Sequence, residues 1–548
     1  MDRFRSFASF TAAALVVVLG MLPATAAAAQ VNVDCARGNT ISKALAAHPS
    51  APDLVLVVSG TCTENVVVTR DNVAMTTNGS STASVVAADN TLPAISLDGA
   101  HRVVIDGVFT NGFSVSGGTF GIAAARGSSV DVANCAVSGA SNTGIISSYG
   151  STVSVDSCSV TGNVTGVAAV NTASAAVTNS TVSGNTGSGL LAVRSAYLRV
   201  GQDRSGSVTV KPVTVSRNGV NGIGISEGSA GTIVGGTVER NTASNIFVGR
   251  ASSGQIGLGS NGLTGGVTIR DGLSNGLAIE GGNATIVYST ITDNALRGIV
   301  ISNGGSARIG VTNNNAVFGP NTISGNRTDG IGIFHSSAAF VGGNTINANV
   351  LFGINVGQAA AAIVGGNAIT NNGQTGVFVR AGQVLIGDPG FGPPTTLNTI
   401  SGNGATGPNN GGVFAFEAGN LFVTDATISD NIGPAVQAFE AGVIELRGST
   451  AVTVPSIGTT VGAAVRLGST LRVRDTASIV SATSDGIQAS NNTSVNISGN
   501  SIQGNGVGAF GVRCVTTFPM TASAATLTGN LAAVTGSTGS DTGCNIFP

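Results

Sequence analysis

A phrase of about 22–23 residues repeats along this chain and constrains its fold more than any other feature. The phrase reads NLFVTDATISDNIGPAVQAFEAG at 420–442, and it returns with changes at 151–172, 283–304 and 337–358. Each copy holds a β-branched strand, a polar turn with Asn after Gly or Asp, and a Gly-Ile-x-Val strand. A fixed period of this length is typical of a solenoid, whose repeats bury a core only by stacking on their neighbours.

The composition agrees with a chain built from strands and tight turns. Among 548 residues there are 81 Gly and no Trp, and only 9% of the residues are charged. The abundant Val, Ile, Thr, Asn and Gly are residues of strands and turns rather than of helices. A formal net charge of −2 gives no electrostatic footprint for nucleic acid or an anionic membrane, so we expect neither partner.

The beginning of the chain has the pattern of a secretory signal peptide. Arg3 and Arg5 precede the apolar run Ala12–Leu22, and small residues follow as far as Ala29. The run is too short to span a membrane, and no later stretch of the sequence qualifies. We therefore expect residues 1–29 to be removed and the mature protein to be secreted to the periplasm, the cell surface or the medium.

The rest of the chain divides into two caps and a repeat region. Residues 30–70 are expected to form an N-terminal cap and first turn, 71–515 the repeats, and 516–548 a C-terminal cap. A short amphipathic helix over Thr40–His48 would cover the apolar core that a solenoid exposes at its end. The repeats predict roughly 15–17 turns and a length of about 75 Å at the spacing of hydrogen-bonded strands.

The stretch GTCTENVVVTRDNV at 60–73, together with the repeats, resembles the right-handed parallel β-helix superfamily, the pectate-lyase-like group. The resemblance implies an all-β, right-handed parallel β-helix with an N-terminal cap helix. It does not imply one chemistry, because the superfamily contains polysaccharide lyases, hydrolases, epimerases, tailspikes and adhesins. The Asp-Pro-His motif of uronan epimerases, the catalytic motifs of polygalacturonases and the acidic cluster of calcium-assisted lyases are missing, and no specific enzyme family matches.

Six cysteines in an exported chain favour disulfides. Cys135 and Cys158 occupy equivalent places in successive repeats, so stacking would bring them within reach of each other. Cys35 with Cys62 would close the N-terminal cap, and Cys514 with Cys544 the C-terminal cap. Free buried thiols are the alternative. No Cys-x-x-Cys pair or neighbouring His completes a zinc site.

Two features of the repeat are expected to be structural. The Ile and Val of Gly-Ile-x-Val should point inward, and the turn asparagines should form an inward ladder, each amide bonding the next turn. The asparagines in question are Asn163, Asn185, Asn294, Asn326, Asn403, Asn431 and Asn500. Several repeats carry extra residues at one register, which should project from one edge and build a wall beside a sheet; these are 201–215, 257–272, 310–322, 386–398 and 404–411.

A polar column follows the Gly-Ile-x-Val strands. Its alternating first part, Arg194, Glu227, Arg250 and Glu280, reads as cross-strand ion pairs. Glu417 and Glu440 follow as like charges in adjacent repeats, with Arg380 and Arg466 one repeat to either side. They are candidate catalytic residues, since two carboxyl groups about 5 Å apart suit a retaining glycosidase. A compensated charge ladder and a cation site, with calcium as the possible ion, are the alternatives.

Phenylalanines occupy outward positions near these charges. Phe334, Phe378, Phe414, Phe416 and Phe439 would form a patch that binds a ligand, docks a partner or lies beneath the 386–398 loop. His335 lies beside them and can exchange a proton near neutral pH.

The sequence thus predicts an exported, non-catalytic binding or cell-surface protein with an extracellular polysaccharide as the expected ligand. A polysaccharide lyase or glycoside hydrolase, and a purely structural surface protein, are the alternatives. No resident cofactor is expected apart from possible calcium, and the sequence does not reveal the oligomeric state.

Overall fold

The computed structural model describes most of the chain from residue 28 onward. The described residues are 28–79, 81–312, 319–387, 397–407, 410–454, 461–481, 484–490, 492–498, 501–505, 509–514 and the backbone of β55 (Ala525–Gly529), β56 (Val534–Thr535) and β57 (Cys544–Phe547). The predicted signal segment therefore lies, up to residue 27, outside the described residues, and β1 (Ala29–Asp34) begins at Ala29. No helix in the described residues has the length and apolarity that a membrane crossing requires.

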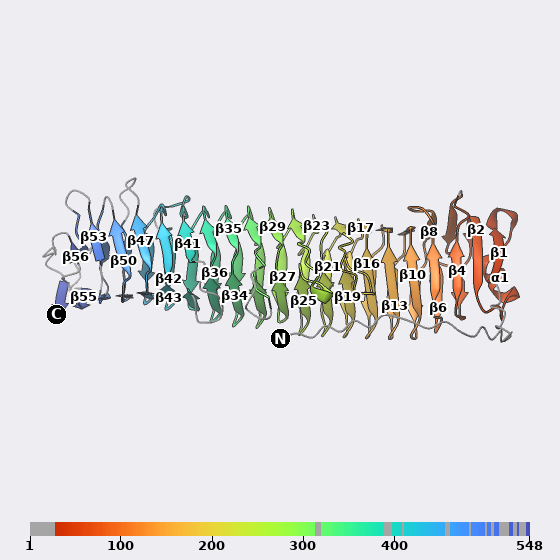
Figure 1. Cartoon of the computed structure of the whole chain (residues 1–548), viewed down its shortest axis with the longest axis horizontal. Coiled ribbons are helices and arrows are strands. Elements are labelled where there is room, and N and C mark those ends of the chain that lie inside the picture. The colour runs from red at the N-terminus through yellow and green to blue at the C-terminus, as the bar shows by residue number, and fades with distance from the viewer. Residues whose placement is uncertain are drawn as a thin grey trace, which may run out of the picture.

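The chain winds into a parallel β-solenoid of about 20 turns, stacked side by side along the long axis in Figure 1. The predicted fold is confirmed, but the expected 15–17 turns are too few. The difference lies mainly before residue 128, where the repeat phrase is lost and the strands are kept. There β4 (Val73–Thr76) and β7 (Val103–Asp106) pair in parallel as later turns do.

Each turn contributes three short strands to three parallel sheets. In one turn these are β28 (Asn283–Ile286), β29 (Thr290–Thr292) and β30 (Ile299–Ser302). We name the sheets that contain them sheet A, sheet B and sheet C. In the next turn Ile286 pairs with Ile309, Ile291 with Ile323 and Ile299 with Ile331, and all of these side chains are fully buried. The core is thus a set of aliphatic stacks that run the length of the solenoid.

Two runs of strands position the sites described below. In sheet A the run is β19 (Tyr197–Val200), β22 (Ala230–Ile233), β25 (Ser253–Ile256), β28, β31 (Ser306–Ile309), β34 (Ala338–Gly342) and β37 (Ala361–Gly365). In sheet C the run is β12 (Thr143–Ser148), β15 (Thr165–Val170), β18 (Leu190–Val193), β21 (Ile223–Ile225), β24 (Ile246–Gly249), β27 (Leu277–Glu280), β30, β33 (Ile331–Ile333), β36 (Ile354–Gly357), β39 (Val377–Arg380), β42 (Val413–Phe416), β45 (Val436–Phe439) and β48 (Ala463–Val465).

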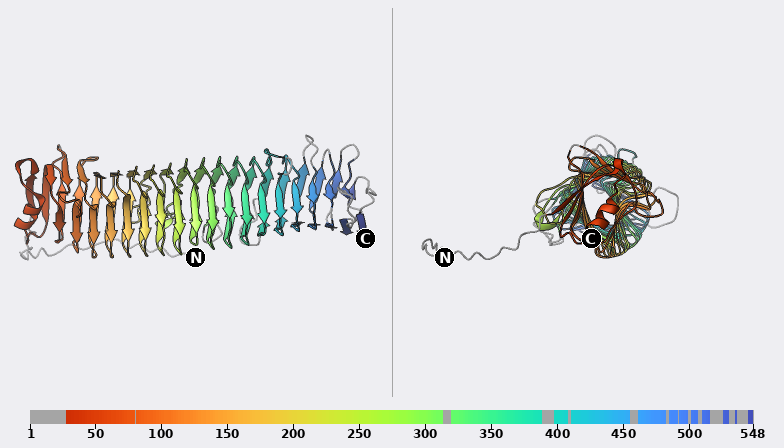
Figure 2. Two further views of the ribbon diagram at one scale, coloured as in Figure 1. Left: turned by 180° about the vertical axis from the view of Figure 1, so that it is seen from behind. Right: turned by 90° about the vertical axis from the view of Figure 1, so that its right-hand side faces the viewer.

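The expected cap helix is present as α1 (Ile41–Ala47) and lies across the N-terminal end of the coil, as the end-on view in Figure 2 shows. The Thr40 side chain accepts a hydrogen bond from the Lys43 N–H, as an N-cap residue does. The Glu64 carboxylate accepts the N–H groups of Ile41 and Ser42 at 2.7 and 3.0 Å. A buried carboxylate at a helix N-terminus satisfies two otherwise unpaired donors and fixes the cap on the first turn.

The predicted asparagine ladder is confirmed in the described part of the chain; Asn500 lies outside it. Except at Asn294, each Asn side chain after Asn163 accepts from the backbone N–H and the amide N–H of the Asn before it, at 2.8–3.4 Å. The ladder runs through Asn163, Asn185, Asn218, Asn241, Asn245, Asn294, Asn326, Asn349, Asn372, Asn403 and Asn431.

One turn of the ladder has Gly272 where an asparagine would stand. The Asn245 amide bridges that gap by donating to Asn294 Oδ1 at 3.1 Å, and the Gly272 N–H donates to the same oxygen at 3.0 Å. A Cβ at position 272 would lie 2.8 Å from the Asn245 amide nitrogen, which explains the glycine. The continuity of the hydrogen-bonded chain is therefore preserved even where the repeat is broken.

We predict that Asn349→Ala lowers the unfolding free energy by about 2–4 kcal/mol, because it leaves buried donors and acceptors of the two adjoining turns unpaired. Asn349 accepts from Asn326 and donates to Asn372 Oδ1 and the Ile323 carbonyl. Chemical denaturation of the mature protein measures the change. Asn347→Ala, two residues earlier on the outer face, is the control and is expected to change it by less than about 0.5 kcal/mol. Equal losses in both variants would contradict a special role for the ladder.

The cysteines confirm one predicted disulfide and correct another. Cys35 and Cys62 are bonded, with their Cα atoms 5.1 Å apart. Cys135 and Cys158 are free and buried, so the predicted bridge between them is wrong. Cys514 is disulfide-bonded, but the side chain of Cys544 lies outside the described residues, so their pairing stays a prediction.

Parallel stacking explains why the two free thiols do not join. Equivalent positions in adjacent turns have parallel Cα–Cβ directions, whereas a disulfide needs Cβ atoms that face each other. Cys158 Sγ instead accepts the Cys135 N–H at 3.3 Å, and each thiol donates to a backbone carbonyl two residues earlier. The hydrogen bond with Cys158, together with burial, raises the pKa of the Cys135 thiol well above its usual range.

We predict that both thiols are unreactive in the folded protein, because both are buried away from reagents and the raised pKa of Cys135 disfavours its thiolate. Titration with a thiol reagent, without reductant, should find neither of them in native buffer and both after denaturation. Recovery of a Cys135–Cys158 disulfide peptide would contradict the arrangement described here.

Candidate functional site

A groove on the outer face of sheet A is the first candidate site. Its volume is about 740 Å³, and it crosses seven strands, β19 to β37, along the solenoid axis. The side chains that line the groove stand at outward or edge positions of these strands. At most of the positions between them the residue is Gly or Ala. At the spacing of hydrogen-bonded strands, the groove is roughly 29 Å long.

Hydroxyl and amide groups line this groove, and carboxyl groups do not. Its polar lining is Tyr197, Thr232, Ser253, Gln255, Asn283, Thr285, Ser306 and Arg308. Small residues, such as Ala338 and Ala361, form the floor between the polar side chains. The groove therefore offers many neutral hydrogen-bonding groups, one guanidinium and no carboxylate or imidazole to act as an acid or base.

Two aromatic side chains mark the ends of the groove region. The Tyr197 hydroxyl shares a hydrogen bond with Thr232 Oγ1 at 2.8 Å, and the Arg199 guanidinium lies 5.5 Å from the centre of its ring. Phe340 lines the groove near the other end. Flat rings with a polar tip or a neighbouring cation are suited to pack against the faces of sugar rings while the surrounding groups bind hydroxyls.

Four of the five insertions follow strands of sheet A, and the described loops form part of the expected wall there; residues 313–318 of the 310–322 insertion lie outside the described residues. The described loops 201–212 and 257–266 follow β19 and β25 and touch each other. Gln202, which is fully buried, donates to the Ser260 carbonyl and accepts the Ser260 N–H, and Asn261 donates to the Gly206 carbonyl. Residues 388–396 of the predicted 386–398 insertion lie outside the described residues, and 404–411 follows sheet B instead.

The loop 201–212 is tied to sheet A by charge. Asp203 binds Lys211 at 3.0 Å, and Arg204 pairs with Asp131 on the outer face of an earlier sheet A strand. The Ser205 hydroxyl, with help from Lys211, lowers the pKa of Asp203 to about 2. These contacts hold the loop in place beside the N-terminal end of the groove.

Little in the sequence predicted this groove. Each strand contributes only two outward residues, and serines, threonines and alanines at those places carry no local motif. The usable signals were the alternation within sheet A strands and the insertions at their ends, which mark the sheet beside which a wall forms.

The predicted polar column proves to be two adjacent columns at the C-terminal ends of sheet C strands. Arg194, Glu227 and Arg250 are in register in the turns, whereas Glu280 and Arg380 stand one residue earlier, on the strands. Glu227 lies 3.5 Å from Arg194 and 3.4 Å from Arg250, as predicted for alternating charges. These exposed pairs contribute only a few tenths of a kcal/mol each.

The candidate catalytic residues lie on this same rim, outside the lining of the sheet A groove. Arg380 binds both carboxylate oxygens of Glu417, at 2.6 and 2.8 Å, and this pairing raises the pKa of Arg380. Glu417 and Glu440 follow the paired residues Phe416 and Phe439 and therefore occupy equivalent turn positions. No ion pair of Glu440 or Arg466 occurs in the described part of the chain, so the charge ladder is compensated at one end only. A catalytic role for these residues stays a prediction.

The predicted phenylalanines do come together on the outer face of sheet C. Phe378, Phe414, Phe416 and Phe439 form a continuous cluster with ring centres 5.4–5.8 Å apart from one ring to the next. Phe352, which sequence reasoning missed because it precedes its strand, stacks on Phe378 at 4.6 Å. All are half-buried, mainly by one another.

Phe334 and His335 lie apart from that cluster. The Arg297 guanidinium covers the Phe334 ring at 5.0 Å and binds Asp329, a buried carboxylate, at 2.9 Å. Burial raises the pKa of Asp329, while Arg297 and Asn355 oppose the rise. His335 is exposed, and its ring contacts the Phe334 ring edge to face. Ligand binding by this pair stays a prediction.

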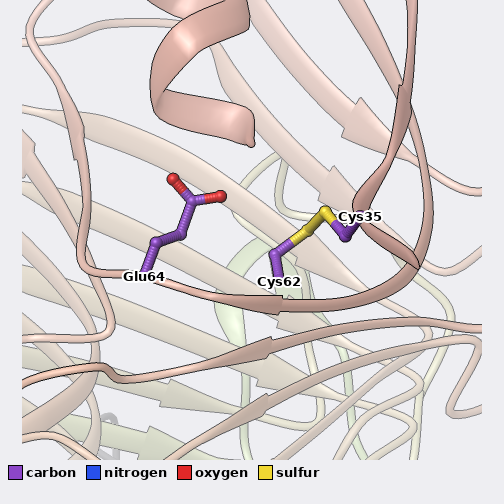
Figure 3. A group of neighbouring side chains, drawn as sticks. All are labelled: Cys35, Cys62 and Glu64. Carbon is purple, nitrogen blue, oxygen red and sulfur yellow. A yellow bond between two sulfur atoms is a disulfide. The ribbon is translucent and has the colours of Figure 1, made fainter. Parts of the chain in front are cut away.

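One group of side chains in the described residues has the composition of a metal site. Cys35, Cys62 and Glu64 have ligand atoms within 4.8 Å of one another. Figure 3 shows the three side chains. The sulfurs are joined as a disulfide, and the carboxylate binds the N-terminus of α1. The group is therefore structural, and the possible calcium ion stays a prediction.

Comparison with known proteins agrees with this architecture. Residues 71–201 and 263–388 match the family model described as the right handed beta helix region. No curated protein matches the chain. The chain is accordingly a right-handed parallel β-helix repeat protein, and no specific enzyme family is matched.

Similar solved structures come from proteins named for alginate. The periplasmic alginate epimerase AlgG is 15% identical with a TM-score of 0.35, over 67% of this chain and 78% of that one. The A-module of Azotobacter vinelandii mannuronan C-5 epimerase AlgE4 is 12% identical with a TM-score of 0.30, over 80% and 90%. The alginate lyase from Paenibacillus sp. str. FPU-7 is 12% identical with a TM-score of 0.23, over 72% and 98%. Likenesses this distant carry no functional argument.

We predict that Asp203→Asn loosens the wall of the groove and speeds trypsin cleavage after Arg204 about 5- to 30-fold, since local opening loses charge-assisted bonds. Because the pKa of Asp203 is lowered in the folded protein, its contribution to the stability of the loop is complete above pH 3.8 and is lost as the pH falls toward 2. Asp98→Asn, which removes the exposed pair with Arg126 on another face, is the control. Equal cleavage of the variant and the parent protein would contradict the assignment.

Proposed function

We propose that this protein is an exported polysaccharide-binding protein that holds an extended glycan in the groove of sheet A without cleaving it. The observation that carries the proposal is the groove itself, about 740 Å³ of open volume running along the axis over seven strands. An elongated site of this shape suits a linear polymer better than a compact metabolite.

The chemistry of the lining supports the same ligand class. Neutral hydroxyl or amide groups recur on the strands from β19 to β31, and sugar hydroxyls both donate and accept hydrogen bonds. The repeat of the solenoid spaces these groups regularly, so that successive units of a polymer meet equivalent partners. Tyr197 and Phe340 add apolar surface for ring faces.

The lining also favours binding over catalysis. Its ionisable side chains are Tyr197 and Arg308, and neither a carboxyl pair nor a histidine faces the groove among the lining residues. General acid–base hydrolysis of a glycosidic bond needs such a pair. The enzyme alternative rests on Glu417 and Glu440, and Arg380 occupies both oxygens of Glu417.

We predict that Ala338→Trp weakens polysaccharide binding about tenfold or more, because an indole on the groove floor excludes the ligand by contact. Ala338 is an exposed lining residue of β34. The mature protein is screened against plant, algal and bacterial polysaccharides by affinity electrophoresis, and dissociation constants for the hits are measured by calorimetry. New reducing ends are measured in the same samples.

Thr345→Trp places the same side chain at an exposed position of sheet B in the same turn and should leave binding unchanged. Binding that survives Ala338→Trp would remove the groove as the site. Cleavage products that vanish in Glu417→Gln would establish the enzyme instead. Absence of any binding across the panel would leave a structural surface protein.

A further inference from the structure

Sheet C differs from the other two sheets in what it presents to solvent. The outward positions of sheet B are mostly Thr and Ser, as in β29, β32 (Thr322–Ser324) and β35 (Thr345–Asn347). Those of sheet C are mostly apolar from β12 to β48: the half-buried Ile146, Val170, Leu191, Val193, Phe247, Phe378, Phe414, Phe416 and Phe439, with the buried Ala168, Ala278, Val300 and Ala464 between them. These apolar side chains form two groups, one on β12–β24 and one on β39–β45, separated by the Arg297–Asp329 pair beside Phe334. Exposed apolar groups of this size mark a surface that a partner covers.

The rim where the chain enters sheet C carries a second apolar row. Large aliphatic residues immediately before or near the strand starts are each more than 40% exposed: Val164, Val220, Leu273, Leu296, Val350 and Ile432. Solvated turns have no need of such residues, and the row widens the apolar face on one side. The opposite rim carries the charged residues Arg194, Glu227, Arg380 and Glu417.

We propose that sheet C is the interface of a homodimer in which a second copy packs face to face and antiparallel along the solenoid axis. The two-fold axis lies along the strand direction at β30. With this symmetry the strands of both copies run in the same direction, and each rim of one copy lies beside the same rim of the other. A turn that lies a given number of turns before β30 in one copy therefore faces the turn that lies the same number after β30 in the other. The proposal does not depend on the polysaccharide, whose groove lies on sheet A.

Side-chain size is complementary in this arrangement. Phe378 comes to Gly224, Phe416 to Val193 and Phe439 to Val170, whereas Phe414 comes to Leu191. Three of the four clustered phenylalanines on one half of the face thus meet smaller residues on the other half. On the entry rim, Leu296 meets its own copy at the two-fold axis and Val164 meets Ile432.

Charge fixes the register of the two copies. With the axis at β30, Arg194 comes to Glu417 and Glu227 to Arg380. A shift by one turn in one direction brings Arg194 to Arg380, and a shift in the other brings Glu227 to Glu417, which are like charges. Like-charge juxtaposition is costly at an interface, so the neighbouring registers are disfavoured.

The face is large enough for a stable dimer. From β12 to β48 it measures roughly 58 Å along the axis and roughly 13 Å along the strands. That is about 750 Å² for each copy, near the 800 Å² or so that a specific interface buries on each side. Aromatic residues at the centre of each half are the side chains expected to carry most of the binding energy.

We predict that the mature protein is a dimer by light scattering coupled to size exclusion, and that Phe416→Ser raises the dimer dissociation constant about 30-fold or more. Phe422→Ser is the matched control, because Phe422 is an equally half-buried outward phenylalanine on sheet A, in β43 (Asn420–Thr424), outside the groove lining. It should leave the dissociation constant unchanged. Thermal melting of both variants confirms that each is folded.

A charge exchange tests the register. Glu227→Arg and Arg380→Glu should each weaken the dimer, and the double variant should restore it. Glu227 and Arg380 lie six turns, or about 29 Å, apart within one chain, so they do not contact each other there. The double variant also does not restore the ion pairs that each residue makes within its own chain. Recovery of the dimer would therefore report contact between the two copies. A monomeric parent protein, or a dimer indifferent to Phe416→Ser, would overturn the proposal. A monomer whose polysaccharide binding is lost in Phe416→Ser would assign the face to a glycan instead.

Discussion

The backbone hydrogen bond between one turn and the next is the interaction on which the whole molecule depends. It holds equivalent residues of successive turns at the spacing of β-strands, and every other regularity follows from that spacing. Ile286 lies on Ile309, Asn326 on Asn349 and Phe416 on Phe439 because each pair occupies one register. A solenoid of this kind is held by contacts between neighbours, so each turn stabilises only the turns beside it.

Stacking has consequences for polar groups that are different inside and outside the coil. Inside, a side chain that can donate and accept at once, such as an asparagine amide, joins an unbroken chain of hydrogen bonds. A thiol in the same kind of position also makes a hydrogen bond between adjacent turns. Cys135 and Cys158 therefore remain free thiols. Outside, identical charges would repel, and the chain alternates their sign or pairs them, as Arg380 does with Glu417.

The three faces of the coil carry three chemistries, and the functional proposals follow from that division. Sheet A has small and hydroxylic residues beside a wall of loops and offers a groove for a neutral hydrogen-bonding polymer. The outer face of sheet B carries mostly threonine and serine, which suit a surface in contact with water. Sheet C is apolar with one aliphatic and one charged rim, which suits a second copy of the chain. Binding along one face and pairing along another would let a dimer present two grooves to one polymer.

Much of this protein was determined by its sequence alone. The period identified the solenoid, the alternation gave the inward stacks, and the turn asparagines gave their ladder, because each is a local pattern repeated at a fixed spacing. The cap helix was predictable from one local amphipathic segment, and the Cys35–Cys62 bond from two cysteines within the same short cap. Tertiary structure decided the rest. Tyr197 and Ile363 are 166 residues apart and join one groove only because insertions of unequal length leave the strand register intact. The contact of Arg380 with Glu417 likewise depends on a one-residue offset between strand and turn, which the spacing of the repeat does not fix.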